Sequence, residues 1–110
     1  MREGSARFHL KMYTLPLGEL MASIVDEDAL GLVERDEEKG LIIDVNESFY
    51  KGEIVEESEA LRVIEEAEVI ILVGKRAVRL GVESGYVHED TILKVGSLEY
   101  AQIVKVRFQE

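Results

Sequence analysis

The sequence contains no cysteine and no tryptophan, and it has a single proline. Because cysteine is absent, disulfide bonds, thiolate zinc sites and thiol nucleophiles are all excluded. Asparagine and glutamine are also scarce, whereas Glu, Lys, Arg, Val and Ile are abundant. This composition is typical of thermophilic proteins, so we expect a thermophilic source.

Long apolar runs are missing as well. The longest apolar stretch, Val69–Val73, is far shorter than the roughly 20 residues that a membrane-spanning helix needs. No apolar segment accompanies the arginine within residues 1–6, so nothing there predicts a secretory signal. We therefore expect a soluble cytoplasmic protein without a membrane partner.

Acidic side chains far outnumber basic ones. The chain has 23 Asp and Glu against 13 Lys and Arg, which gives a formal net charge of −10. This charge repels phosphate backbones, so non-specific nucleic-acid binding is not expected. A local basic patch could still bind one RNA.

With 110 residues, of which 46% are hydrophobic, the chain can bury one continuous core. We predict a flexible amino terminus at 1–6 and a single α+β domain at 7–110. The predicted fold has a mixed or mainly antiparallel sheet with two main helices.

Hydrophobic alternation predicts the strands. Residues 7–13 alternate as a half-buried strand does, and residues 19–25 follow a turn that contains the proline. We expect these two segments to form an antiparallel hairpin with the second strand more central. Two further hairpins are predicted, one from 32–35 with 41–45 and one from 91–95 with 100–108. The acidic triplet Asp26-Glu27-Asp28 is interpreted as the cap of a single helical turn.

Two segments show helical spacing. Glu56–Ala67 is amphipathic, with Glu57 or Ser58 as the predicted cap, and Lys75–Ser84 is a second helix that ends at Gly85. Between them, Val69–Val73 is short and β-branched, which favours a buried strand. One long helix running through Gly74 fits the same pattern.

A basic cluster at the start of the second helix is the first candidate binding site. Gly74, Lys75, Arg76 and Arg79 lie where a strand would lead into a helix, and such helix starts can hold phosphate. A Walker loop would need glycine five positions before Gly74, where Val69 stands. The alternative is a solvated helix face on which Arg79 pairs with Glu83.

Adjacent aromatic residues form the second candidate. Phe49, Tyr50, Lys51 and Gly52 are expected in a loop between a strand and a helix, where one ring can fill the core while the other is exposed. An exposed ring beside a lysine can stack on a base or anchor a partner. The alternative is ordinary core packing of both rings.

No catalytic residue, metal site or cofactor is predicted. Neither His9 nor His88 has a second histidine or a cysteine at ligand spacing, and the serines lack a nearby histidine or a Gly-x-Ser-x-Gly elbow. The protein is therefore expected not to be an enzyme.

The chain resembles an archaeal family known as domain of unknown function 424, roughly from Phe8 to Val106. The resemblance implies a cytoplasmic archaeal protein whose biochemical role is not established. In the family pattern a proline and a histidine often precede the closing Ala-Gln, where this chain has Leu98-Glu99-Tyr100, so a role for that histidine would be absent here. The motifs that carry the resemblance are Phe49-Tyr50-Lys51-Gly52, the acidic helix, Leu72-Val73-Gly74-Lys75-Arg76-Ala77-Val78, Gly85-Tyr86-Val87 and Ala101-Gln102.

Three functional hypotheses follow. The first is a non-catalytic binding or adaptor module that contacts a protein or ribonucleoprotein through the aromatic and basic residues together. The second is a small-molecule enzyme that uses carboxylates and a phosphate-holding helix start. The third is a homo-oligomer joined through apolar hairpin edges.

Overall fold

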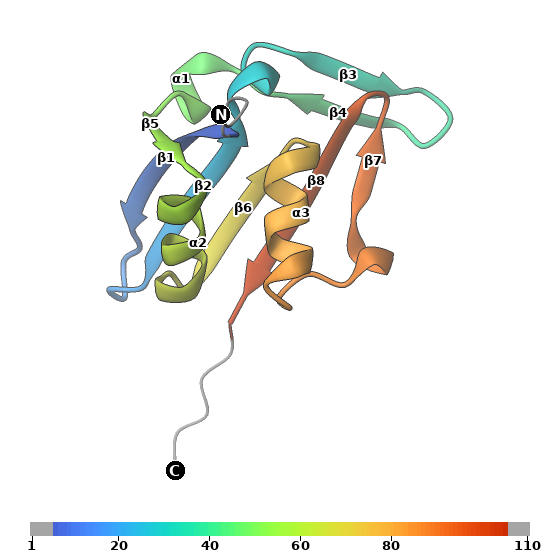
Figure 1. Cartoon of the computed structure of the whole chain (residues 1–110). Helices are drawn as coiled ribbons and strands as arrows, with labels where there is room; N and C mark the ends of the chain where they lie inside the picture. Colours follow the sequence, from blue (N-terminus) through green and yellow to red (C-terminus); the bar gives the residue numbers. More distant parts are fainter. Residues whose placement is uncertain (1–5, 106–110) are drawn as a thin grey trace, which may run out of the picture.

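A six-stranded sheet forms the body of the protein, in the strand order β5-β1-β2-β6-β8-β7, and the strands β3 and β4 form a separate two-stranded sheet (Figure 1). The structure is a computed structural model that describes residues 6–105. Short 3-10 turns occur at Glu27–Ala29 and Glu89–Thr91. The strands and helices are β1 (Arg7–Thr14), β2 (Leu20–Asp26), β3 (Val33–Asp36), β4 (Leu41–Asp44), α1 (Glu47–Tyr50), β5 (Glu53–Glu56), α2 (Glu57–Glu66), β6 (Val69–Val73), α3 (Lys75–Glu83), β7 (Leu93–Val95) and β8 (Leu98–Val104).

The expected α+β fold with a mixed sheet and two main helices is confirmed. Strands β1 and β2 form the predicted antiparallel hairpin, and β2 is the more central of the two. The open question at Val69–Val73 is answered by β6, which pairs parallel with β2 and antiparallel with β8. The side chains of a central strand are covered on both faces of the sheet, so its sequence is a continuous apolar run.

Two apolar clusters lie on opposite faces of the large sheet. Helices α2 and α3 cover one face (Figure 1), where Phe8, Ile24 and Leu72 are fully buried. On the other face, Val25 and Val73 pack with Val45 from the segment that follows the β3–β4 hairpin. Because side chains alternate along a strand, the strands β2, β6 and β8 each contribute to both clusters.

The segment around the aromatic pair differs from the predicted loop. Residues 47–50 form the short helix α1, and the Asn46 side chain accepts a 2.9 Å hydrogen bond from the Phe49 amide. Strand β5 then pairs with β1 at the edge of the sheet. This strand was not predicted, because Ile54 and Val55 are its only apolar residues and show no alternation.

Several predicted boundaries also change. The last hairpin is shorter, since β7 begins only after the 3-10 turn at 89–91, whereas β8 begins two residues early at Leu98. Residues 106–108 of the predicted strand lie outside the described residues. The predicted caps of α2 were wrong, because Glu56 occupies the cap position without a side-chain bond.

The predicted flexible terminus falls mainly at 1–5, outside the described residues. Ala6, the last residue of the segment predicted to be flexible, packs against the cluster under the helices.

Candidate functional site

Asp26 caps helix α3 from the end of a neighbouring strand. Its carboxylate accepts hydrogen bonds from the backbone amides of Arg76, at 3.0 Å, and Ala77, at 2.7 Å. Asp26 occupies the cap position of the single turn at Glu27–Ala29, as predicted, but its side chain makes no capping hydrogen bond there. The carboxylate instead binds amides of a helix 50 residues away along the chain.

The parallel pairing of β2 and β6 explains this contact. Both strands end at the same edge of the sheet, so Asp26 at the end of β2 lies beside Gly74, which follows β6. Gly74 has φ of +107°, and an added Cβ would collide with the carboxyl group of Asp26. Glycine is therefore needed here for both its backbone angle and its lack of a side chain.

Burial raises the pKa of Asp26, whose residue is only 5% exposed. The hydrogen bonds from the backbone amides of Arg76 and Ala77 oppose this rise in pKa, as does the charge of Arg76. The charge of Asp28 adds to the rise. Since both amides already bind this carboxylate, they are not available to a phosphate. The helix start thus lacks two of the donors that a phosphate-holding site would use.

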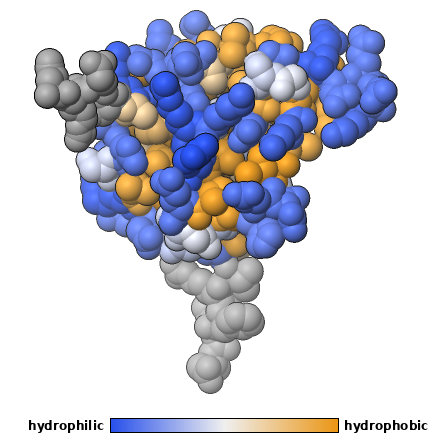
Figure 2. Space-filling model, turned by 45° about the vertical axis from the view of Figure 1, so that its right-hand side comes forward, coloured by the Kyte–Doolittle hydropathy of each residue, from blue (hydrophilic) through white to orange (hydrophobic). Residues whose placement is uncertain are grey.

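The predicted cations are exposed on the outer face of α3. Lys75, Arg76 and Arg79 form no ion pair within residues 6–105, so the alternative pairing of Arg79 with Glu83 is not found there. On the face turned forward in Figure 2, hydrophilic side chains are interleaved with apolar surface. We call Lys75, Arg76 and Arg79 the α3 cluster.

Three shallow hollows surround the α3 cluster. One of about 330 Å³ lies at the helix start and is lined by Asp26, Asp28 and Gly74 beside Lys75 and Arg76. A second of about 370 Å³ is lined by all three cations. A third of about 410 Å³ is lined by Lys75 and Arg79 together with three glutamates, Glu83, Glu89 and Glu99. The cationic side chains therefore border concave surface on several sides.

The aromatic pair forms a second, separate group. Phe49 is 42% exposed, its ring stacks on that of Tyr13 with centroids 6.0 Å apart, and Tyr50 meets it edge to face at 4.7 Å. Tyr50 is half-buried against the cluster on the face opposite the helices. Burial raises the pKa of Tyr50, and nearby Tyr100, Tyr13 and Asp44 raise it further.

The lysine beside these rings is Lys11, which the sequence did not single out. Its Nζ donates to the Phe49 carbonyl oxygen at 3.1 Å and lies 5.6 Å from the centre of the Tyr13 ring. The predicted Lys51 is exposed at the end of α1, and Gly52 donates a weak 3.4 Å hydrogen bond to His9 Nδ1.

The structure does not bring the two predicted groups together. The α3 cluster lies on the helix-covered face, whereas Tyr50 packs on the opposite face. In the described part of the chain, the cation–π contacts are Lys11 with Tyr13 and Lys105 with Tyr86, so none joins the aromatic pair to α3. The expectation of one surface built from both groups is therefore not met.

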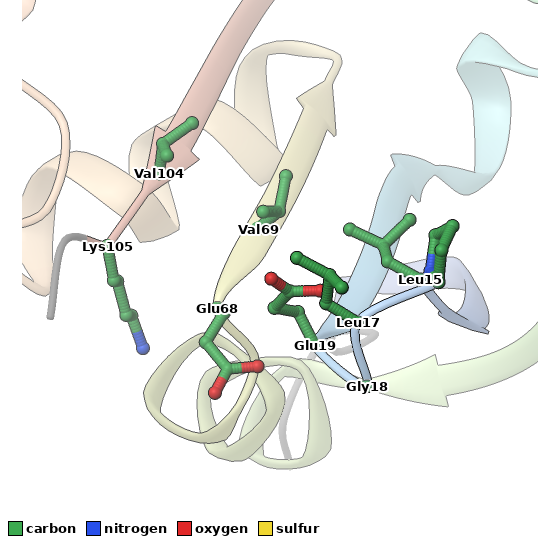
Figure 3. A pocket seen from close by; sticks show the side chains of 9 residues that line it. Leu15, Leu17, Gly18, Glu19, Glu68, Val69, Val104 and Lys105 are labelled. Atoms are coloured by element: carbon green, nitrogen blue, oxygen red, sulfur yellow. The ribbon is translucent and has the colours of Figure 1, made fainter.

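A hollow larger than these three lies at the β1–β2 turn, with a volume of about 760 Å³, and was not predicted. Figure 3 shows Val69 and Val104 on the neighbouring strands β6 and β8, with Leu15 and Leu17 of the turn on the other side of Val69. Leu17 is 88% exposed. The signal in the sequence was the pair of leucines flanking Pro16, which are unusual in an exposed turn.

Within residues 6–105, no group of three or more His, Cys, Asp or Glu side chains could hold a metal ion. None of the helices in this range has the length and apolar character required to cross a membrane.

The fold and the site define a small α+β domain with a cationic helix face, a buried capping carboxylate and a separate aromatic group. The chain belongs to the family described as protein of unknown function (DUF424), whose model matches residues 16–106. This finding confirms the resemblance stated above.

A solved structure has the same fold over nearly the whole chain. It is the crystal structure of an uncharacterized conserved protein from the archaeon Methanopyrus kandleri, with a TM-score of 0.71 and 27% sequence identity. The match covers 96% of this chain and 99% of that one. No protein of curated function matches.

Proposed function

We propose that this protein is a non-catalytic binding module of the archaeal cytoplasm that recognises an anionic segment of a protein or ribonucleoprotein. The α3 cluster is its recognition surface. The observation that carries the proposal is that Lys75, Arg76 and Arg79 are exposed and form no ion pair within the described residues of a chain with net charge −10. Solvated cations in an acidic protein attract carboxylates or phosphates of a partner.

The rigid attachment of α3 supports this role. Asp26 binds the first turn of the helix, and the helix residues Ala77 and Val78 are buried in the core. The backbone that carries the cations is therefore held in place before a partner arrives, which lowers the entropy lost on binding. Arginine adds geometric specificity because its guanidinium can bind a carboxylate or phosphate through two parallel hydrogen bonds.

The enzyme hypothesis has less support. A hollow lies next to Gly74, and it contains a carboxylate with a raised pKa, as an acid or base catalyst would require. That carboxylate, however, accepts two hydrogen bonds from backbone amides, and these bonds hold the start of α3. A structural role accounts for its burial, so the geometry favours binding over catalysis.

Homo-oligomerisation is a second candidate, favoured by one observation on the β3–β4 hairpin. In the described part of the chain these strands pair only with each other, and Val33 and Ile42 on them are 50% and 58% exposed. Unpaired strand edges with apolar side chains are common sites of association. Light scattering in solution separates this candidate from a monomeric binding module.

Charge reversal on α3 tests the proposed function. We expect Arg76→Glu with Arg79→Glu to weaken binding of a labelled polyglutamate peptide at least about tenfold, or about 1.4 kcal/mol, measured by fluorescence anisotropy. The loss arises because attraction between the cluster and the anionic probe becomes repulsion. Partners captured from native lysate, with and without nuclease, are expected to be lost in parallel.

The matched control is Arg35→Glu with Lys39→Glu on the β3–β4 hairpin, which changes the net charge equally. Both residues are exposed and lie away from α3. The control is expected to keep binding within about twofold. Equal losses in the two variants, or no loss in either, would show that the α3 cluster is not the recognition surface.

A further inference from the structure

One face of the large sheet is only partly covered. Helices α2 and α3 lie on the same side of it (Figure 1), and on the other side the hairpin packs near the ends of β2 and β6. The remaining surface of that side includes Tyr13 and Tyr100, both half-buried, Gln102, which is exposed, and Val104, which is 63% exposed. We call this surface the open face.

Aromatic side chains from three segments meet on the open face. Tyr13 comes from β1, Phe49 and Tyr50 from α1, and Tyr100 from β8. The stacking of Phe49 on Tyr13 and its edge contact with Tyr50 join three of these rings. Tyr50 and Tyr100 both pack against the apolar cluster on this face, which places the fourth ring in the same region. Three of the four tyrosines in the sequence are thus gathered here.

The open face also lacks carboxylates from the central strands, although the chain has 23 acidic residues. Strand pairing places alternate residues of β1, β2, β6 and β8 on this side. Their acidic neighbours Asp26 and Glu99 lie on the helix side, beside α3. The side chains on the open face are Arg7, His9, Lys11 and Tyr13 from β1, Met21, Ser23 and Val25 from β2, Val69, Ile71 and Val73 from β6, and Leu98, Tyr100, Gln102 and Val104 from β8.

Polar groups stand among the rings. Gln102 donates to the Tyr100 hydroxyl at 2.7 Å, and the Tyr13 hydroxyl donates to the Phe49 carbonyl at 3.0 Å. The amide oxygen of Gln102 accepts no hydrogen bond within residues 6–105, and Lys11 provides a positive charge at the rim. Beneath this surface, the fully buried Ser23 hydroxyl has no hydrogen-bond partner among residues 6–105.

We propose that the open face binds single-stranded RNA by stacking bases on Phe49, Tyr13 and Tyr100. Aromatic rings on an open sheet stack unpaired bases of any sequence, and a neighbouring cation attracts the phosphates. The net charge of −10 opposes RNA binding elsewhere on the protein, but the central strands place no carboxylate on this face to repel a phosphate backbone. Asp44, whose charge acts on Tyr50, belongs to the hairpin and not to these strands. In the proposed complex, Lys11 contacts the phosphate backbone of the RNA, and Gln102 contacts base edges through its free amide oxygen.

This site goes beyond the proposed function and is separate from the α3 cluster, since the two lie on opposite faces of the sheet. An RNA bound by α3 alone would depend on Arg76 and Arg79. An RNA bound by the open face depends on Phe49 and Tyr100. Substitutions in the α3 cluster and on the open face can therefore be tested separately for their effect on RNA binding.

The absence of tryptophan makes a direct optical test available. In a Tyr86→Phe protein every tyrosine lies on the open face, because Tyr86 is on the helix side, where its hydroxyl donates to Glu65. We expect short oligo(U) and oligo(A) to quench the tyrosine fluorescence of this protein, with duplex RNA of equal length much less effective. Stacking of a base on a tyrosine ring is the cause of the expected quenching.

Variants then locate the binding. Phe49→Ala and Tyr100→Ala are expected to raise the Kd for oligo(U) at least about tenfold each, whereas Tyr100→Phe keeps the ring and is expected to bind as the parent does. The matched control Tyr86→Ala removes an exposed ring from the opposite side and is expected to leave the Kd unchanged. Circular dichroism of each variant checks that it is folded.

Two results would overturn the proposal. One is the absence of quenching and of anisotropy change with either oligonucleotide. The other is RNA binding that survives Phe49→Ala and Tyr100→Ala in folded protein but is lost on charge reversal at Arg76 and Arg79, which would assign the RNA to the α3 cluster.

Discussion

Replacing Asp26 with alanine is expected to lower the free energy of unfolding by about 2–3 kcal/mol at neutral pH. The substitution leaves the amides of Arg76 and Ala77 without their acceptor at the start of α3. Each unsatisfied buried donor costs about 1–3 kcal/mol, and release of the buried carboxylate offsets part of that cost. Urea denaturation followed by circular dichroism measures the change.

Asp28→Ala is the matched control. Asp28 lines the same hollow but is exposed, so its replacement is expected to change the free energy of unfolding by no more than about 0.5 kcal/mol. A loss at Asp26 no larger than that at Asp28 would show that the capping bonds do not stabilise the fold.

The pH dependence of this contribution has a definite sign. Burial raises the pKa of Asp26 above its ordinary value of 3.8, so the native state keeps this proton at a pH where the unfolded chain has lost it. The native state then binds more protons in that window, and stability falls as pH rises through it. We expect the advantage of the wild type over Asp26→Asn to be greatest below pH 3.8 and to shrink as pH approaches the raised pKa. An advantage that grows with pH across this window would contradict the burial effect.

Replacing Gly74 with alanine is expected to cost about 3 kcal/mol or more. Two causes combine, because φ of +107° is unfavourable for alanine and the new Cβ would meet the carboxyl group of Asp26. The collision also displaces the cap of α3, so the variant is expected to lose affinity for anionic probes as well. Thermal and urea denaturation measure the stability change.

Gly85→Ala separates the two causes. Gly85 has a similar φ of +87°, but nothing lies within 4 Å of an added Cβ there. Its replacement is expected to cost about 1–2 kcal/mol from backbone strain alone. If both alanine substitutions lowered the free energy of unfolding equally, the close approach of Gly74 to Asp26 would not contribute to the cost of Gly74→Ala.

The sequence predicted the elements whose patterns are local. Alternation in residues 7–13 and helical spacing in 56–67 identified β1 and α2 to within a residue or two, since each pattern spans several turns or pleats. Strand β5 was missed because Ile54 and Val55 are too few to show a period. The choice between strand and helix at 69–73 required knowing that β2 and β8 flank this segment.

The candidate site was only partly predictable for the same reason. The exposed cations of α3 follow from helical spacing, so they could be named in advance. The capping role of Asp26 depends on the parallel pairing of two strands far apart in the chain. The convergence of Tyr13 and Tyr100 likewise depends on strand order, which no local pattern records.

An NMR titration of the full-length protein with the polyglutamate peptide and the short RNA, each in turn, tests the binding-module account most directly. The account predicts that at least one of them shifts the amide resonances of residues 75–79 progressively and to saturation, with the β3–β4 hairpin unaffected. Spectra in which neither probe moves those resonances, or in which the hairpin moves instead, would contradict it.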